Sequence, residues 1–202
     1  MLTHPALILP KQLAEFPPFV RYDALFSPPE CDELERIGNS HGLVPGSIGN
    51  WIANQPVVNP AYRSVLSTRL EVSEVPWAYE RLRDRAQWTN DAYFGFDLHG
   101  LQQGLVYLRY ETGEFPGQYG WHQDFGGGES SLRKLSIVTQ LSDPERYEGC
   151  RLKLFTDREF DAPTVGRGDT IIFPSWTPHC VTPVTRGVRS ALVAWVSGPR
   201  FR

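Results

Sequence analysis

Residues 170–196 read TIIFPSWTPHCVTPVTRGVRSALVAWV, and this stretch decides the fold class. Two runs rich in β-branched and apolar residues, Thr170–Phe173 and Val188–Val196, are separated by segments that contain proline and glycine. This composition is typical of strands joined by turns. Three segments upstream have the same character: Leu105–Tyr110, Leu135–Leu141 and Arg151–Phe155. The second half of the chain therefore predicts an antiparallel β architecture.

The first half predicts helices at two places. Ser27 is a good N-cap before Pro28, and apolar residues then follow at helical spacing until Gly38, which we expect to stop the helix. A second helix is expected from about Pro76 to Asn90. Between the helices, the stretch from His41 to Pro60 is rich in Gly, Pro and Asn and predicts a loop that is a candidate lid. The simplest architecture is a helical layer packed against a β-sandwich or open barrel.

Composition narrows the class of protein. The chain has 202 residues, a net charge of -3 and no run of lysine and arginine, so we expect no nucleic-acid partner and no anionic membrane surface. Its three cysteines are too few and too scattered for a disulfide framework, and we expect a reducing, cytoplasmic location. No apolar run approaches the roughly 20 residues that span a bilayer. We expect a single domain over 1–202, with a helical, loop-rich support region over about 1–100 and a β core over about 101–198.

His122 and Asp124 are candidate metal ligands. Residues i and i+2 of a strand point to the same face, so the two side chains should converge. An isolated His-x-Asp tripeptide is more often part of a polar surface strand, but His179 follows a separate strand and supplies a third ligand. Two histidines and one carboxylate form the facial set of non-haem Fe(II) oxygenases, which leaves positions of the metal open.

Arg189 lies ten positions after His179, near the start of the last apolar strand. Strand alternation puts Arg189 on the same face as Ala191, Val193 and Trp195, so its guanidinium should enter an apolar pocket. A buried guanidinium requires an anion and binds a carboxylate through two parallel hydrogen bonds. An internal salt bridge is the structural alternative. Arg186 is the rival anion binder, but its turn sequence favours exposure to solvent.

These motifs together resemble the prolyl-4-hydroxylase-type branch of the Fe(II)/2-oxoglutarate dioxygenases. The resemblance rests on Tyr110–Gly113, His122–Asp124, Gly149, Gly168–Asp169, Phe173–Ser175, His179 and Arg189. Leu141–Gly149 and His179–Arg189 are especially similar to bacterial PKHD-type hydroxylases. The resemblance runs from about Phe19 to Val196. It implies a mainly β (α+β) fold: a double-stranded β-helix (jelly-roll, cupin-like) core with N-terminal helices packed on one sheet.

The resemblance also implies roles for particular residues. His122, Asp124 and His179 match the iron ligands, and Arg189 matches the residue that pairs with the distal carboxylate of 2-oxoglutarate. Tyr110 and Gln140 match positions near that co-substrate. We expect Val138, Leu152, Leu154, Val193 and Trp195 to line the pocket. The cofactors implied are Fe(II), 2-oxoglutarate and O2, with ascorbate as an accessory reductant, and the products are succinate, CO2 and a hydroxylated substrate.

One departure from the family pattern is Cys150, which follows Gly149 where relatives carry a second glycine. We expect this small side chain to keep the turn. Asp124 is retained, which argues against a halogenase, whose pattern replaces that carboxylate.

The substrate is expected to be an amino acid, a peptide or a protein side chain, and the oligomeric state is left open. Candidate substrate residues are Trp51, Trp121, Arg133 and Trp176, for each of which a surface or core role is an equal alternative. An AlkB-like nucleic-acid demethylase would carry a second arginine at the position of Trp195. A catalytically silent barrel used for binding would have lost a ligand or Arg189, and a zinc hydrolase would use another ligand spacing.

Overall fold

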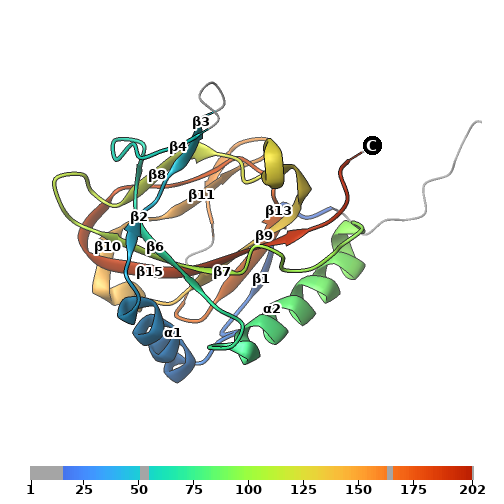
Figure 1. The fold of residues 1–202 in the computed structure, drawn as a ribbon, viewed down its shortest axis with the longest axis horizontal. Coiled ribbons are helices and arrows are strands. Elements are labelled where there is room, and N and C mark those ends of the chain that lie inside the picture. The colour runs from blue at the N-terminus through green and yellow to red at the C-terminus, as the bar shows by residue number, and fades with distance from the viewer. Residues whose placement is uncertain (1–15, 51–54, 163–165, 202) are drawn as a thin grey trace, which may run out of the picture.

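Two antiparallel β-sheets face each other, and two helices cover the outer face of the larger one (Figure 1). The computed structural model describes residues 16–50, 55–162 and 166–201. The eight-stranded sheet contains, in spatial order, β1 (Val20–Tyr22), β13 (Thr170–Pro174), β9 (Arg133–Gln140), β15 (Val184–Ser197), β7 (Leu105–Glu111), β6 (Leu66–Leu70) and β2 (Val44–Pro45), and β10 (Tyr147–Gly149) also pairs with β15. The five-stranded sheet contains β12 (Glu159–Asp161), β11 (Leu152–Phe155), β14 (His179–Val181), β8 (Gln118–His122) and β5 (Arg63–Ser64).

The last strand, β15, is the centre of the large sheet. It pairs with β7 on one side and with β9 on the other, so both of its edges are hydrogen-bonded. Its residues from Ser190 to Ala194 are all buried, because the small sheet covers one face and the helices cover the other. The five segments predicted as strands correspond to β7, β9, β11, β13 and β15, and the mainly β prediction is confirmed.

Two apolar cores follow from this layering. One lies between the sheets and includes Tyr110, Leu154 and Phe173. The other lies between the large sheet and the helices and includes Tyr107 and Leu192. Neighbouring residues of one strand thus serve different cores, as the period of two requires. The core between the sheets supplies most of the apolar residues that line the candidate site.

Helix α1 (Pro28–Ser40) begins as predicted but ends later. Ser27 and Glu30 form a capping box, which satisfies amide groups at the first turn. Gly38 does not stop the helix, which continues to Ser40. Instead, Gly38 lets α1 approach the sheet, because a Cβ at this position would lie 2.4 Å from the ring of Tyr107.

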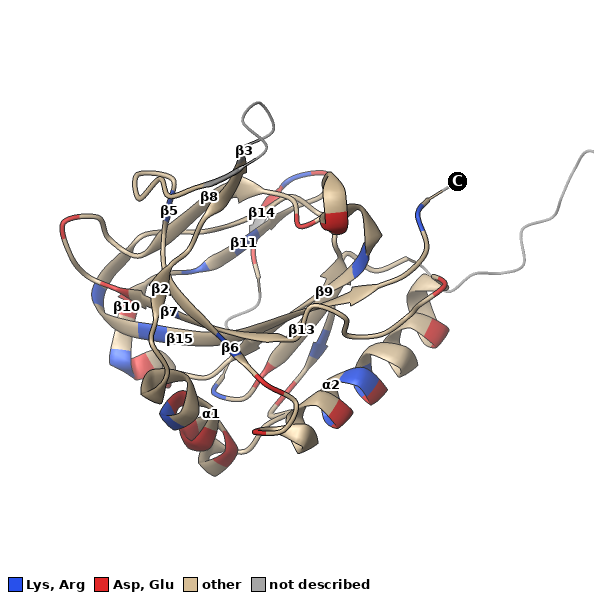
Figure 2. Cartoon of the chain, viewed as in Figure 1, with Lys and Arg blue, Asp and Glu red and all other residues tan. Residues whose placement is uncertain are grey.

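Helix α2 (Pro76–Thr89) matches the second predicted helix and continues into a π-helical turn, η1 (Asn90–Phe94). Arg81 of α2 donates two hydrogen bonds to the Glu30 carboxylate of α1, so the two helices are linked across the face of the sheet. Acidic residues predominate on α1, whereas α2 carries both acidic and basic residues (Figure 2). In the described part of the chain, no helix is long and apolar enough to cross a membrane.

The stretch from His41 to Pro60 is more ordered than the predicted loop. It contains β2 and a two-stranded hairpin of β3 (Ile48–Asn50) and β4 (Gln55–Val57). Trp51, the substrate candidate in this stretch, lies outside the described residues. Ser47 and the first residues of the hairpin, Ile48 and Gly49, lie beside the candidate site.

Candidate active site

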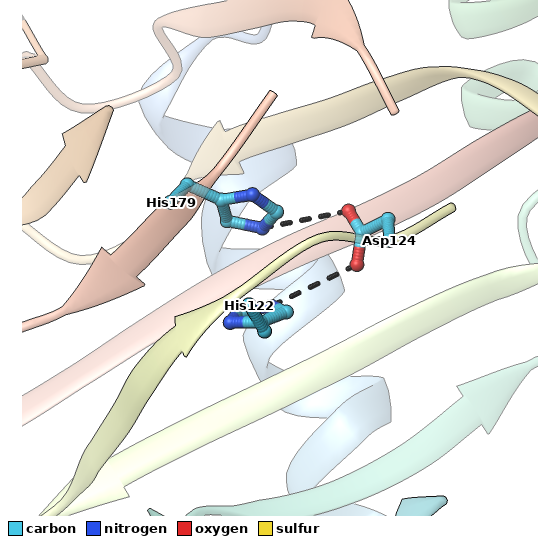
Figure 3. A group of neighbouring side chains, drawn as sticks. All are labelled: His122, Asp124 and His179. Atoms are coloured by element: carbon cyan, nitrogen blue, oxygen red, sulfur yellow. Dashed lines mark ion pairs between the residues drawn. The ribbon is translucent and has the colours of Figure 1, made fainter. Parts of the chain in front are cut away.

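His122, Asp124 and His179 come together between the sheets (Figure 3). The histidines are register partners on β8 and β14, and Asp124 lies just beyond the end of β8. The ligand atoms of the three side chains all lie within 4.8 Å of one another. Asp124 Oδ1 is 3.8 Å from His122 Nε2, and Asp124 Oδ2 is 3.5 Å from His179 Nε2. Two nitrogens and one carboxylate thus face a common point.

Both imidazoles are held with the same nitrogen toward that point. His122 Nδ1 donates to Gly120 O at 2.8 Å, and His179 Nδ1 donates to Thr177 O at 2.9 Å. A carbonyl accepts only from a protonated nitrogen, so each Nε2 keeps its lone pair in the neutral ring. Stacking of Tyr119 on His122, with ring centroids 3.5 Å apart, fixes that ring further. This is the arrangement that a divalent metal requires of histidine.

The charge states also suit a cation. Burial, and after it the proximity of His179, lowers the pKa of His122 to about 3, so that this imidazole is neutral at pH 7. Burial opposes ionisation of Asp124, but the two histidines and a hydrogen bond from Ser136 hold the pKa of its carboxyl below the usual value. That bond runs from Ser136 Oγ to Asp124 Oδ2 at 2.7 Å. The cluster therefore presents the negative charge of Asp124 beside the neutral imidazole of His122.

Arg189 lies on the inner face of β15 and is 3% exposed. Its Nε donates to Gln140 Oε1 at 2.9 Å, and its guanidinium carbon is 5.6 Å from the centre of the Tyr110 ring. Arg189 and Tyr110 are register partners on β15 and β7. No ion pair forms between Arg189 and any carboxylate that the structure describes. The rival Arg186 is exposed and pairs with Glu148.

Cys150 contacts the same guanidinium and was not expected to do so. Both residues line the same cavity, and burial raises the pKa of the Cys150 thiol although the nearby guanidinium opposes the shift. Cys150 has a φ of 48° and follows Gly149 with a φ of 74°, so two successive residues adopt the left-handed conformation that glycine favours. The turn is kept, as predicted, but the side chain packs against Arg189.

A narrow cavity connects the metal-ligand cluster with Arg189. The predicted lining residues Val138, Leu152, Val193 and Trp195 all lie along it. Leu154 does not line it; this residue is fully buried in the core between the sheets, opposite His179 on β11. A second cavity of about 140 Å³ reaches Arg189 and Gln140 from the side of Cys150.

A wider opening of about 440 Å³, which we call the mouth, joins the ligand cluster to solvent. Arg133 lines the mouth and contacts Asp124, with its Nη1 3.2 Å from the Asp124 carbonyl oxygen. Trp121 is 39% exposed and contacts Phe155, away from the mouth. Trp176 packs among Phe16, Phe96 and Phe201 instead. Of the substrate candidates that the structure describes, only Arg133 lies at the site.

The residues at the site that were missed from the sequence include Ser136, Arg63 and Tyr119. Ser136 shares a face of β9 with Val138 and Gln140, so strand alternation would have found it. Arg63 and Tyr119 are register partners on β5 and β8. Nothing in the sequence shows that β5 exists or that it pairs with β8.

Comparison with known proteins finds related sequences for about half of the chain, in its C-terminal part. Residues 105–197 match the model of the 2OG-Fe(II) oxygenase superfamily. A PKHD-type hydroxylase of Synechococcus sp. (strain CC9605) is 37% identical over 105 residues, which cover 50% of this chain and 45% of that protein. The chain thus spans about half the length of the curated relatives that it matches.

Solved structures share the fold over most of the chain. A Pseudomonas putida prolyl-4-hydroxylase has a TM-score of 0.70 at 16% identity, covering 90% of this chain and 93% of the other. A Trichoplax adhaerens prolyl hydroxylase, solved with a hypoxia inducible factor peptide fragment, has a TM-score of 0.70 at 14% identity, covering 90% and 84%. These likenesses confirm the predicted jelly-roll core.

Proposed function

Because the chain belongs through residues 105–197 to the 2OG-Fe(II) oxygenase superfamily, we propose that it hydroxylates an unactivated C–H bond with Fe(II), 2-oxoglutarate and O2. His122, Asp124 and His179 hold the iron, and Arg189 holds 2-oxoglutarate. The observation that carries the proposal is the ligand cluster, in which two Nε2 atoms and one carboxylate face one point within 4.8 Å of one another.

The donor set fits Fe(II) on chemical grounds. Two imidazoles and one carboxylate are the facial set of non-haem iron oxygenases, and they leave coordination positions for a chelating oxo-acid and for O2. Bound iron supplies the oxidation chemistry, while the protein supplies placement and a dry wall. Val138, Leu152 and Val193 are the apolar part of that wall.

Arg189 has the properties of a co-substrate anchor. Arg189 is 3% exposed and has no carboxylate partner among the described residues. A buried charge without a partner is costly, so binding of an anion here would be strongly favourable. Gln140 fixes its Nε, which leaves the terminal nitrogens for a carboxylate. Burial raises the pKa of Tyr110 well above its usual value, so that its phenol stays protonated and serves as a second donor beside Arg189.

The substrate we propose is an amino-acid side chain, in a peptide, in a protein or in the free amino acid. The mouth has room for such a group directly over the ligand cluster. The Trichoplax prolyl hydroxylase of the same fold was solved with a peptide fragment. The products are the hydroxylated side chain, succinate and CO2.

The test is succinate formation from 2-oxoglutarate with Fe(II), screened over amino acids, peptides and proteins. We expect His122→Ala and Asp124→Ala to abolish turnover and to lose Mn(II) binding measured by electron paramagnetic resonance. Turnover that survives both substitutions would refute the iron assignment.

Arg189→Ala should raise the KM for 2-oxoglutarate by about a hundredfold, since a charge-assisted bidentate pair contributes roughly 1.5–3 kcal/mol. Arg186→Ala is the matched control, because it removes an exposed arginine that pairs with Glu148 and does not line the cavity. Equal effects of the two substitutions would contradict the assignment of Arg189.

The same residues argue against the two alternative functions, a silent binding barrel and an AlkB-like demethylase. A silent binding barrel predicts a lost ligand or a lost arginine, and the structure brings all four residues together. An AlkB-like demethylase predicts an arginine where Trp195 lines the pocket.

A further inference from the structure

The mouth carries more positive charge than the proposed chemistry requires. Among the described residues that line it, the charged side chains are Arg63, Arg133 and Asp124. Asp124 belongs to the ligand cluster, so a bound divalent metal would engage its charge. Arg189, which lies deeper, is set aside for 2-oxoglutarate. Among the described residues, Arg63 then has no carboxylate partner, and the one carboxylate near Arg133 is that of Asp124.

Arg63 is held in place without being neutralised. Its guanidinium carbon lies 4.5 Å from the centre of the Tyr119 ring, and its Nη1 donates to Ser47 O at 2.5 Å. Its stem packs against Gly46, where a Cβ would lie 2.8 Å from Arg63 Nε. That Nε is buried and has no hydrogen-bond partner, and Arg63 forms no ion pair with any residue that the structure describes. A fixed cation with an unsatisfied buried donor is costly unless a ligand completes it.

Arg133 is placed on the other side of the ligand cluster. Its guanidinium carbon lies 3.9 Å above the Trp195 ring, and its Nε donates to Gln103 at 2.8 Å. The nearest carboxylate oxygen, Asp124 Oδ1, is 3.9 Å from Nη1, which is beyond hydrogen-bond distance. Stacking on an indole and a neutral amide partner orient the guanidinium, and its one carboxylate partner among the described residues is Asp124 of the ligand cluster, at a distance that leaves the guanidinium able to accept a closer anion.

We propose that Arg63 and Arg133 bind a carboxylate of the substrate at the mouth. Two like charges placed over one cavity repel each other, and an anion between them removes that cost while gaining bidentate hydrogen bonds. Tyr119 and Trp195, beneath the two guanidiniums, form an apolar floor for the rest of the substrate. The inference rests on the proposed function and specifies its substrate class as an acid.

The direct test uses trifluoroacetate as the probe, with its binding measured by fluorine NMR. The full chain is loaded with Zn(II) and 2-oxoglutarate, so that the ligand cluster and Arg189 are occupied. We expect Arg63→Gln to weaken trifluoroacetate binding about tenfold and Arg63→Gln/Arg133→Gln to weaken it further, since each charge-assisted pair is worth about a factor of ten or more. Neutral trifluoroacetamide should not bind.

Two controls separate the mouth from general charge effects. Arg186→Gln removes an exposed arginine outside the mouth and should leave the affinity for trifluoroacetate unchanged. Arg63→Lys keeps the charge and should recover part of the affinity. Equal binding by the wild-type protein and the double variant would overturn the proposal, and circular dichroism spectra check that each variant is folded.

The source of the carboxylate is decided by three pools of compounds tested for stimulation of succinate formation. The pools are N-acetyl amino acids with a free α-carboxylate, C-amidated peptides that contain Asp or Glu, and matched amides that contain Asn or Gln. Stimulation by the first pool assigns a free acid or C-terminus, and stimulation by the second assigns an acidic side chain. Stimulation by the neutral amides alone contradicts the proposal.

The experiments distinguish failure of the proposed oxygenase function from failure of the substrate inference. If the wild-type protein binds neither Mn(II) nor 2-oxoglutarate, the oxygenase assignment fails, and trifluoroacetate binding to the empty chain then decides the role of Arg63 and Arg133. If metal and 2-oxoglutarate bind but the arginine substitutions leave trifluoroacetate binding unchanged, the substrate inference alone fails.

Discussion

Ser136 joins the ligand cluster to the large sheet. Its hydroxyl donates to Asp124, and it also lies 3.0 Å from the Ser175 hydroxyl, so the carboxylate is held from behind. We expect Ser136→Ala to weaken Mn(II) binding about 10- to 100-fold, the usual effect of removing a hydrogen bond to a ligand. Titration followed by electron paramagnetic resonance measures it.

A matched substitution distinguishes this effect from a general loss of buried hydroxyls. Thr139→Val removes a buried hydroxyl of the same strand, one that bonds to Thr170 and not to Asp124. Thr139→Val should leave the affinity for Mn(II) unchanged. A similar loss in both variants would show that the strand, and not the hydrogen bond to Asp124, sets the affinity.

At the residue scale, the sequence correctly predicts which side chains share a face of a strand, because this depends only on alternation along that strand. The period of two puts Arg189 and Trp195 on the same face of β15, and both line the cavity. Arg63 was not predictable, because its position depends on the register of β5 against β8, which is a long-range pairing. The contact of Cys150 with Arg189 was missed because strands distant in sequence bring the two residues together.

At the element scale, Gly38 sets how closely α1 approaches the sheet. Alanine is the better helix former by about 1 kcal/mol, but a Cβ at this position would lie 2.4 Å from the Tyr107 ring. Tyr107 is fully buried and shares a hydrogen bond with Ser190, so it has no room to move. We expect Gly38→Ala to destabilise the protein by about 1–3 kcal/mol in urea unfolding. Gly42→Ala, with no neighbour within 4 Å, should have little effect.

The ion pair between α1 and α2 predicts a dependence of stability on pH. Hydrogen bonds from Arg81 are the main cause that lowers the pKa of Glu30 from 4.5 to about 2. A carboxyl whose pKa is lower in the folded state stabilises that state above pH 4.5 and loses this contribution as the pH falls toward 2. The difference in unfolding free energy between the wild type and Glu30→Gln should therefore be largest near neutral pH and disappear at about pH 2.

Chemical unfolding at a series of pH values measures that difference. Because both side chains are partly exposed, we expect no more than about 1 kcal/mol at pH 7, decreasing with added salt. Glu33→Gln removes the partner of Arg36 within α1 and serves as the control for an ion pair that joins no second element. If the difference in unfolding free energy between the wild type and Glu30→Gln stays constant down to pH 2, ionisation of Glu30 is not its cause.

At the scale of the whole molecule, the site spans both sheets. His122 and His179 belong to the small sheet, whereas Arg189 and Tyr110 belong to the large one. A ligand that contacts both sets therefore links the sheets and stabilises the folded state. At about 100 times its dissociation constant, a ligand adds about 2.7 kcal/mol, which raises the Tm of a chain of this size by roughly 5–10 °C.

Differential scanning calorimetry tests this linkage in two steps. Mn(II) alone should raise the Tm, and 2-oxoglutarate added with Mn(II) should raise it again. Arg189→Ala should keep the first increase and lose the second. If 2-oxoglutarate raises the Tm of the variant as much as that of the wild type, the co-substrate does not contact Arg189.

The architecture was predictable where strands are long and apolar. The five predicted strands are all present, and both helices start where the sequence places them. The short strands β2 to β5 were missed, because their residues carry no periodic pattern and are strands only through pairing. The predicted end of α1 was wrong because a glycine after an apolar run usually ends a helix. Here Gly38 lies within the helix and allows it to pack closely against Tyr107.

The carbonyls of Gly120 and Thr177 accept hydrogen bonds from the two imidazoles and so fix the orientation of each ring. Because these bonds do not depend on which ion is bound, the three donors offer little discrimination between divalent ions of similar size. Competition is then governed by intrinsic affinity, which is lower for Fe(II) than for Co(II), Ni(II), Cu(II) or Zn(II). Which ion occupies the site is thus decided by the supply of metals around the protein, and protein purified over a nickel resin should carry nickel until it is stripped and reloaded with iron.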